Sequence, residues 1–71
     1  MNATNYNARG YAFSNLRNYP QAINDFTKAI ELDPNFTDAY VNRGFSYYNS
    51  LEKQKALKDW QTAVGQKPKL D

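Results

Sequence analysis

The apolar residues of this chain recur at the spacing of an α-helix through most of its length. Tyr6, Gly10, Phe13 and Leu16 follow one another at intervals of three and four residues, which places them on one helical face. A second apolar face follows, made of Ala22, Ile23, Phe26, Ala29 and Ile30. The pattern therefore predicts two helices in the first half of the chain, joined by a short polar segment.

Residues that begin or end helices bound the second of these segments. Asn18 can cap a helix, and Pro20 would stand in its first turn, where the missing N–H of proline is harmless. Pro34 disfavours helical geometry in the residue before it, so the helix is expected to end at Asp33.

The second half of the chain has the same organisation. Asn35 is expected to cap the third helix, and Asp38 stands in its first turn, where a carboxylate favours the helix dipole. Helices are expected at residues 36–50 and 53–66. The chain as a whole is predicted to be four helices in two antiparallel pairs.

The two halves are an internal repeat with a period of 34 residues, and residues 3–36 align with residues 37–70 without a gap. The identical pairs are Tyr6/Tyr40, Arg9/Arg43, Gly10/Gly44, Asn15/Asn49, Ala22/Ala56, Asp25/Asp59, Ala29/Ala63 and Pro34/Pro68. Most of these residues are apolar or small, as a shared packing scheme would require. We therefore expect one domain over residues 1–71, built from one unit at 3–36 and a second at 37–70.

Two glycines lie inside predicted helices at matching positions. Gly10 and Gly44 each cost about 1 kcal/mol relative to alanine in a helix interior. A repeated cost suggests a repeated reason, namely a close approach of the partner helix, with Ala22 and Ala56 as the facing small residues. At this spacing Trp60 is interpreted as a core residue and not as part of a cofactor site.

A 34-residue helix–turn–helix unit with an aromatic residue, a glycine four positions later and a second aromatic three positions after that resembles the tetratricopeptide repeat. The family's pattern continues with a small residue, an aromatic, an alanine and a closing proline. The first unit supplies Tyr6, Gly10, Phe13, Ala22, Phe26, Ala29 and Pro34, and the second supplies Tyr40, Gly44, Tyr47, Ala56, Trp60, Ala63 and Pro68. The resemblance implies an all-α fold, in which two antiparallel helix–turn–helix units stack as a short right-handed solenoid.

Both units depart from the family at one position, where Arg9 and Arg43 replace the usual leucine. Asp25 and Asp59 follow these arginines by sixteen residues in each unit. In an antiparallel hairpin the two side chains could approach, so we hypothesise the ion pairs Arg9–Asp25 and Arg43–Asp59. The alternative is that both carboxylates face water.

The resemblance also implies a function. Tetratricopeptide repeats are interaction scaffolds whose first helices line a concave groove, so the chain is expected to bind a peptide or a partner helix there. The matching positions are Asn7, Tyr11, Ser14 and Asn15 in the first unit and Asp38, Val41, Asn42, Phe45, Tyr48 and Asn49 in the second. Asn42 is the strongest single candidate, because the family often uses that position to hold a peptide backbone; the alternative is that Asn42 bonds only within the helix surface.

Some members of the family bind chaperones by holding a terminal carboxylate with a lysine and an asparagine. The corresponding positions here are Asn7 and Tyr11, and the downstream basic positions correspond to Asp38 and Asn42. No cation stands at any of them, and Asp38 would repel a carboxylate. We therefore do not expect recognition of a chaperone C-terminus.

Composition argues against catalysis. The chain has no Cys and no His, which removes thiol nucleophiles, thiolate metal sites and the commonest general base. Its acids form no cluster with metal-ligand spacing, and no Gly-rich phosphate loop is present. The sequence predicts a non-enzyme with no cofactor and no metal.

Charge and hydropathy narrow the range of partners that the chain is expected to bind. The net charge is +2, and the lysines from Lys53 onward alternate with Glu, Asp and Gln, which is typical of a solvated helix face. A nucleic-acid partner is not expected, and no apolar run approaches the roughly 20 residues of a membrane span. The first residues lack a secretion signal, which together with the absence of Cys favours a cytoplasmic location.

Two units are few for a solenoid, since about three or more are normally needed to bury the apolar faces. Leu32 is expected to pack on the following helix pair, and Gln66 at the matching position suits the end of an array. Apolar surface is expected to remain around Leu57, Val64 and Leu70. Either the chain is a piece of a longer array, or it self-associates.

The second turn bears on self-association. Residues 51–55 contain no Gly, Pro or Asn, and residues 51–60 are good helix formers. A continuous helix across this segment would convert the hairpin into a swapped homodimer. A structural self-association element with no separate ligand is therefore the alternative to a peptide-binding module.

Overall fold

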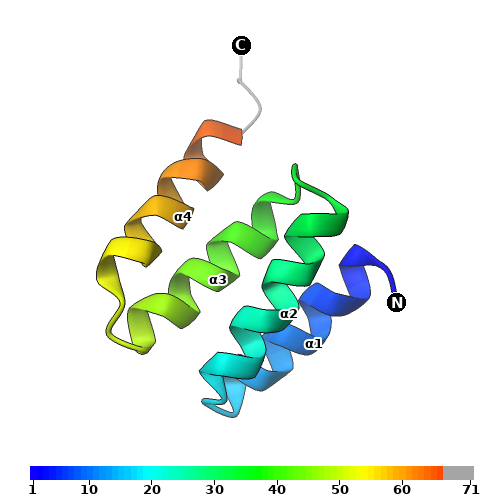
Figure 1. The fold of residues 1–71 in the computed structure, drawn as a ribbon, viewed down its shortest axis with the longest axis horizontal. Coiled ribbons are helices and arrows are strands. Elements are labelled where there is room, and N and C mark those ends of the chain that lie inside the picture. Colours follow the sequence, from blue (N-terminus) through cyan, green and yellow to red (C-terminus); the bar gives the residue numbers. More distant parts are fainter. Residues whose placement is uncertain (67–71) are drawn as a thin grey trace.

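The computed structural model describes residues 1–66, which fold into four α-helices (Figure 1). The helices are α1 (Ala3–Asn15), α2 (Tyr19–Leu32), α3 (Thr37–Asn49) and α4 (Lys53–Gln66). They form two antiparallel pairs, so the predicted all-α, helical-repeat solenoid is confirmed. Pro68 and Leu70, to which the sequence assigned packing and surface roles, lie outside the described residues.

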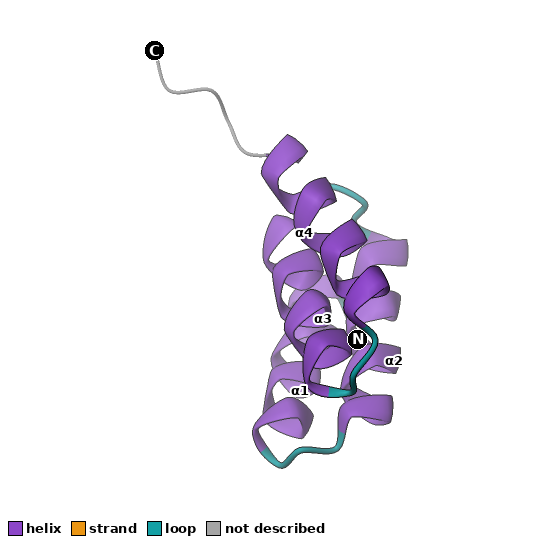
Figure 2. Cartoon of the chain, turned by 90° about the vertical axis from the view of Figure 1, so that its left-hand side faces the viewer, coloured by secondary structure: helices purple, strands orange, loops and turns teal. Residues whose placement is uncertain are grey.

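The helices pack in a regular order. α1 packs against α2, α3 packs against α4, and the two pairs join where α3 packs against α2 and touches α1. In Figure 1, α3 lies between α2 and α4, and in Figure 2 all four helix axes run roughly along the vertical. The apolar core consists of Ala22, Phe26, Ala29, Ala39, Ala56 and Ala63.

Small residues dominate this core because the glycines and alanines allow close contacts. A Cβ atom on Gly10 would lie 2.7 Å from Cε1 of Phe26 and 3.1 Å from the carbonyl oxygen of Ala22. A Cβ atom on Gly44 would lie 2.6 Å from Cδ1 of Trp60. Each glycine thus makes room for the large aromatic ring of its own hairpin. The carbonyl oxygen of Ala22 faces Gly10 as expected, and at Gly44 the three nearest atoms all belong to the Trp60 ring.

Both hairpins turn in the same way. Arg17 and Leu51, one period apart, adopt left-handed backbone conformations with φ of 62° and 68°. In the second turn the N–H of Glu52 donates to the carbonyl of Tyr47 at 2.8 Å, and the N–H of Leu51 donates to Tyr48 at 3.0 Å. Two backbone hydrogen bonds arranged in this way close the C-terminal end of a helix. Residues 51–60 therefore do not continue α3. The structure contains the hairpin and not the continuous helix.

The sequence misplaced the start of α3. Its N-cap residue is Phe36, not Asn35, and no side chain caps it. The N–H of Asn35 donates to Oδ1 of Asp33 at 3.1 Å, which makes Asn35 part of a turn built by the Asp33 side chain. Asn18 is the N-cap residue of α2 as expected, although its side chain makes no capping bond.

Both hypothesised ion pairs are present. Nε of Arg9 donates to Oδ2 of Asp25 at 2.8 Å, and Nε of Arg43 donates to Oδ2 of Asp59 at the same distance. In each pair a second nitrogen, Nη2, donates to the other carboxylate oxygen. Hydrogen bonding to these carboxylates raises the pKa of both arginines above the usual range.

The last described turn of α4 is tied to the loop between α2 and α3. Nε2 of Gln66 donates to the carbonyl oxygen of Pro34 at 2.7 Å, and Oγ1 of Thr37 donates to Oε1 of Gln66 at 3.0 Å. Leu32, at the matching position of the first unit, is exposed, so the expectation that it packs on the second helix pair is wrong. In the second unit the Gln66 side chain forms hydrogen bonds that a leucine could not form.

Candidate binding surface

A crevice of about 320 Å³ lies between α1 and α3. Its lining consists of Tyr11, Ser14 and Asn15 from α1 and Asn42, Phe45, Ser46 and Asn49 from α3. Most of these side chains were expected in a groove, and the structure brings them together from the two first helices. None of them carries a charge at neutral pH. The crevice can therefore offer amide and hydroxyl hydrogen bonds and two aromatic faces, but no ion pair.

Asn42 is held between the helices. Its Nδ2 donates to Oδ1 of Asn7 at 3.2 Å, which joins α3 to α1. Asn42 therefore does not bond only within the surface of its own helix, because its partner, Asn7, belongs to the other unit. Asn7 itself does not line the crevice.

Besides Asn7 and Val41, which borders the apolar cavity instead, two further expected groove residues lie outside the crevice. Tyr48 packs against Trp60, with 5.8 Å between the ring centroids, and it does not line the crevice. Asp38 is exposed in the first turn of α3 and borders neither the crevice nor the apolar cavity beside it. The structure therefore places these two side chains apart from the polar crevice.

Ser46 is a lining residue that the sequence did not single out. The side chain is 1% exposed, and its hydroxyl is the one buried side-chain polar atom without a hydrogen-bond partner among residues 1–66. An unsatisfied buried group of this kind costs about 1–3 kcal/mol. The sequence feature that could have identified Ser46 is a break in the repeat, because the first unit has Ala12 at the matching position.

Four other serine and threonine hydroxyls behave differently. Those of Thr27, Thr62 and Ser14 donate to backbone carbonyls three or four residues earlier. Ser50, which caps α3, does the same and donates to the carbonyl of Ser46 at 2.6 Å. This bond is the usual way in which a helix satisfies serine and threonine. Ser46 does not form it.

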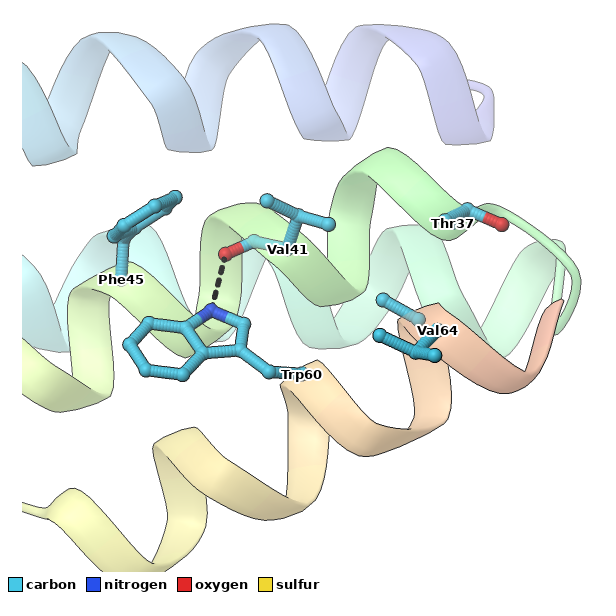
Figure 3. A pocket seen from close by; sticks show the side chains of 6 residues that line it. Thr37, Val41, Phe45, Trp60 and Val64 are labelled. Carbon is cyan, nitrogen blue, oxygen red and sulfur yellow. Dashed lines mark hydrogen bonds between the residues drawn. The ribbon is translucent and has the colours of Figure 1, made fainter. Parts of the chain in front are cut away.

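A second, apolar cavity of about 460 Å³ opens between α3 and α4 (Figure 3). It is lined by Thr37, Val41, Phe45, Trp60, Ala63 and Val64. Nε1 of Trp60 donates to the carbonyl oxygen of Val41 at 3.4 Å, which orients the indole along the cavity wall. Phe45 borders both the cavity and the crevice, so the two adjoin.

The internal repeat explains why this cavity is open. The matching face of the first unit includes Phe26 and Ala29, which are fully buried, and α3 packs against the helix that carries them. Among residues 1–66 no helix covers the second unit in this way, and Val64 is 70% exposed. The cavity is the second unit's copy of a face that is covered in the first.

Within residues 1–66, no three acidic, His or Cys side chains come close enough together to hold a metal ion. None of the four helices combines the length and the apolar character that crossing a bilayer requires.

Comparison with known proteins points to one family. Residues 3–36 match a family model described as "Tetratricopeptide repeat", and residues 26–64 match a second model with the same description. The second match runs from the middle of α2 into α4. Together the two matches span residues 3–64 and reach into all four helices.

Individual relatives are much longer proteins. The DnaJ homolog subfamily C member 7 homolog of Dictyostelium discoideum is 32% identical over 96% of this chain. Hsp70-Hsp90 organizing protein 3 of Arabidopsis thaliana is 33% identical over 90% of it, and human serine/threonine-protein phosphatase 5 is 36% identical over 94%. This chain spans only 13%, 12% and 13% of the lengths of these three proteins.

Proposed function

Because this chain belongs to the tetratricopeptide repeat family, we propose that it is a protein-interaction module that holds an extended peptide in the crevice between α1 and α3. The observation that carries the proposal is the lining of the crevice, where three amides and two aromatic rings meet from the two first helices. Amide side chains can donate to and accept from a peptide backbone. Aromatic faces add contact area at a low cost in conformational entropy.

The similar proteins bear on the kind of partner. The name of one relative refers to organising Hsp70 and Hsp90, so a protein partner for this chain accords with it. Asn7, Tyr11, Asp38 and Asn42 stand where cations and an amide would hold a terminal carboxylate, and none of them is a cation. We propose that the partner of this chain is bound along its backbone and not by its terminal carboxylate.

A catalytic role is not part of the proposal. One relative is named a phosphatase, but this chain matches only 13% of its length. Asp25 and Asp59, the buried acids, are each bonded to an arginine and are not free to act as a base. We propose that the chain itself has no enzymatic activity.

The test is selection of ligands from a random dodecapeptide library displayed on phage, followed by calorimetric titration of the enriched peptides. The variants Asn15→Ala and Asn49→Ala remove crevice amides, and each is expected to weaken binding about threefold to tenfold. Asn24→Ala is the matched control, because Asn24 is exposed on α2 and does not line the crevice. Absence of enrichment, or equal affinity for all three variants, would rule the proposal out.

A second candidate function rests on the apolar cavity. Self-association through this face would cover Val64 and Phe45 and would need no separate ligand. Light scattering at several protein concentrations distinguishes the two functions. A mass that rises with concentration and stays at the monomer value in Val64→Lys supports self-association, and a monomer at every concentration excludes it.

A further inference from the structure

We propose that the crevice between α1 and α3 selects uncharged peptide segments, and that the hydroxyl of Ser46 forms a hydrogen bond to the bound segment. This inference rests on the peptide-binding function proposed above and specifies its ligand. It assigns Ser46 as a specificity-determining residue.

The charges of the two helices are the first argument. α1 and α3 carry three charged side chains, and two of them, Arg9 and Arg43, are bonded to Asp25 and Asp59. The third, Asp38, does not line the crevice. A charged ligand group would give up part of its hydration there and gain no counter-charge from either helix, which is unfavourable. An uncharged group meets no such penalty.

The hydrogen-bonding inventory is the second argument. Asn15, Asn42 and Asn49 each present both a donor and an acceptor group at the crevice. A peptide backbone and a neutral amide or hydroxyl side chain also present both. The crevice therefore matches an uncharged polar segment in kind, and Tyr11 and Phe45 supply apolar faces beside these amides.

The orphaned hydroxyl is the third argument, and it is independent of the other two. Ser46 borders the crevice, and its Oγ atom has no partner among residues 1–66. The matching residue of the first unit, Ala12, is exposed and has no hydroxyl, so the repeat itself does not require this oxygen. No bond among residues 1–66 accounts for the oxygen, whereas a ligand group that reaches into the crevice would satisfy it.

The experiment uses the full 71-residue chain and three sets of end-blocked peptides of equal length. One set contains only Asn, Gln, Ser, Thr, Tyr and Gly, the second has Glu at every third position, and the third has Lys there. Binding is followed by two-dimensional amide NMR titration. We expect the uncharged set to bind most tightly and to shift the signals of the crevice residues.

Ser46→Ala separates a ligand contact from a structural role. We expect this variant to bind the uncharged peptides about fivefold more weakly, while its thermal midpoint stays at or above that of the wild type. Ser50→Ala is the matched control, because that hydroxyl is already bonded to the carbonyl of Ser46 and does not line the crevice. It is expected to lower the midpoint and to leave binding unchanged.

Three results would overturn the inference. Equal or tighter binding of the acidic or the basic set removes the selectivity while leaving a peptide-binding crevice. A lower thermal midpoint with unchanged affinity in Ser46→Ala assigns the hydroxyl to the fold, through a bond to protein or water. If no set shifts the crevice signals, the inference fails together with the proposed function.

Discussion

Arg43 and Asp59 form a bond that reaches beyond their own hairpin. Nη2 of Arg43 lies 2.7 Å from Oδ1 of Asp59, and Nη1 of the same guanidinium donates to Oγ1 of Thr27 on α2 at 3.1 Å. The guanidinium that forms the ion pair inside the second unit therefore also bonds to the first unit. The Arg43 guanidinium also lies over the rings of Tyr40 and Tyr47, at 5.6 and 5.7 Å from their centroids.

The first prediction follows from this bond. Arg43→Gln leaves the buried carboxylate of Asp59 without its cation, and we expect a loss of about 2–4 kcal/mol in the free energy of unfolding. Urea denaturation followed by circular dichroism measures it. The matched variant is Arg9→Gln, whose arginine side chain is 52% exposed where that of Arg43 is 18% exposed. Its loss should be clearly smaller, and equal losses would contradict the role given to the contact between units.

The second prediction concerns the helical glycines. A methyl group on Gly10 would press on the fully buried ring of Phe26, so Gly10→Ala should destabilise the chain by about 1–3 kcal/mol. Gly65→Ala is the control, because among residues 1–66 no atom beyond its own stretch of helix lies within 4 Å of its added Cβ, and it should stabilise the chain by up to about 1 kcal/mol. Chemical denaturation of both variants measures the sign of the change in the free energy of unfolding.

Gly44→Ala should behave differently from Gly10→Ala. Here the added methyl group meets the indole of Trp60, which borders an open cavity and can move into it. We therefore expect a smaller loss of stability together with a change in the emission of Trp60, the single tryptophan of the chain. An unchanged emission spectrum with a large loss of stability would show that the indole cannot move.

The third prediction tests the second turn. Leu51 holds a left-handed conformation that costs a non-glycine residue about 1–2 kcal/mol, so Leu51→Gly should stabilise the hairpin by about 0.5–1 kcal/mol. In a continuous helix the same substitution would destabilise by about 1 kcal/mol. Lys58→Gly, in the middle of α4, should destabilise in either case and serves as the control. The sign of the Leu51→Gly effect thus distinguishes the hairpin from the swapped arrangement.

The fold could be predicted because its determinants repeat along the chain. The glycines, alanines and aromatics of each unit recur at one period, and the same repeat pointed to the pairs Arg9–Asp25 and Arg43–Asp59. These contacts lie within one hairpin, so sequence spacing and helix geometry are enough to infer them. The break at Leu51 is different, because leucine favours helix and gives no sign of the left-handed turn.

The candidate surface was less accessible to sequence reasoning. Tyr11, Phe45 and the crevice asparagines were expected from the family's groove positions, whereas Tyr48 turned toward Trp60 because the rings pack together. Ser46 was missed because a serine on the buried side of a helix usually bonds to a carbonyl of its own backbone. Whether a hydroxyl finds that partner depends on its side-chain conformation, which the sequence does not express.

The central claim is that the crevice between α1 and α3 is the binding surface. Its most direct test is an amide NMR titration of the full chain with a dodecapeptide selected from the random library. We expect the largest shifts at Tyr11, Asn15, Phe45 and Asn49, with the outer face of α4 unchanged. Shifts confined to the outer face of α4, around Gln54, Leu57 and Gln61, with a silent crevice, would contradict it.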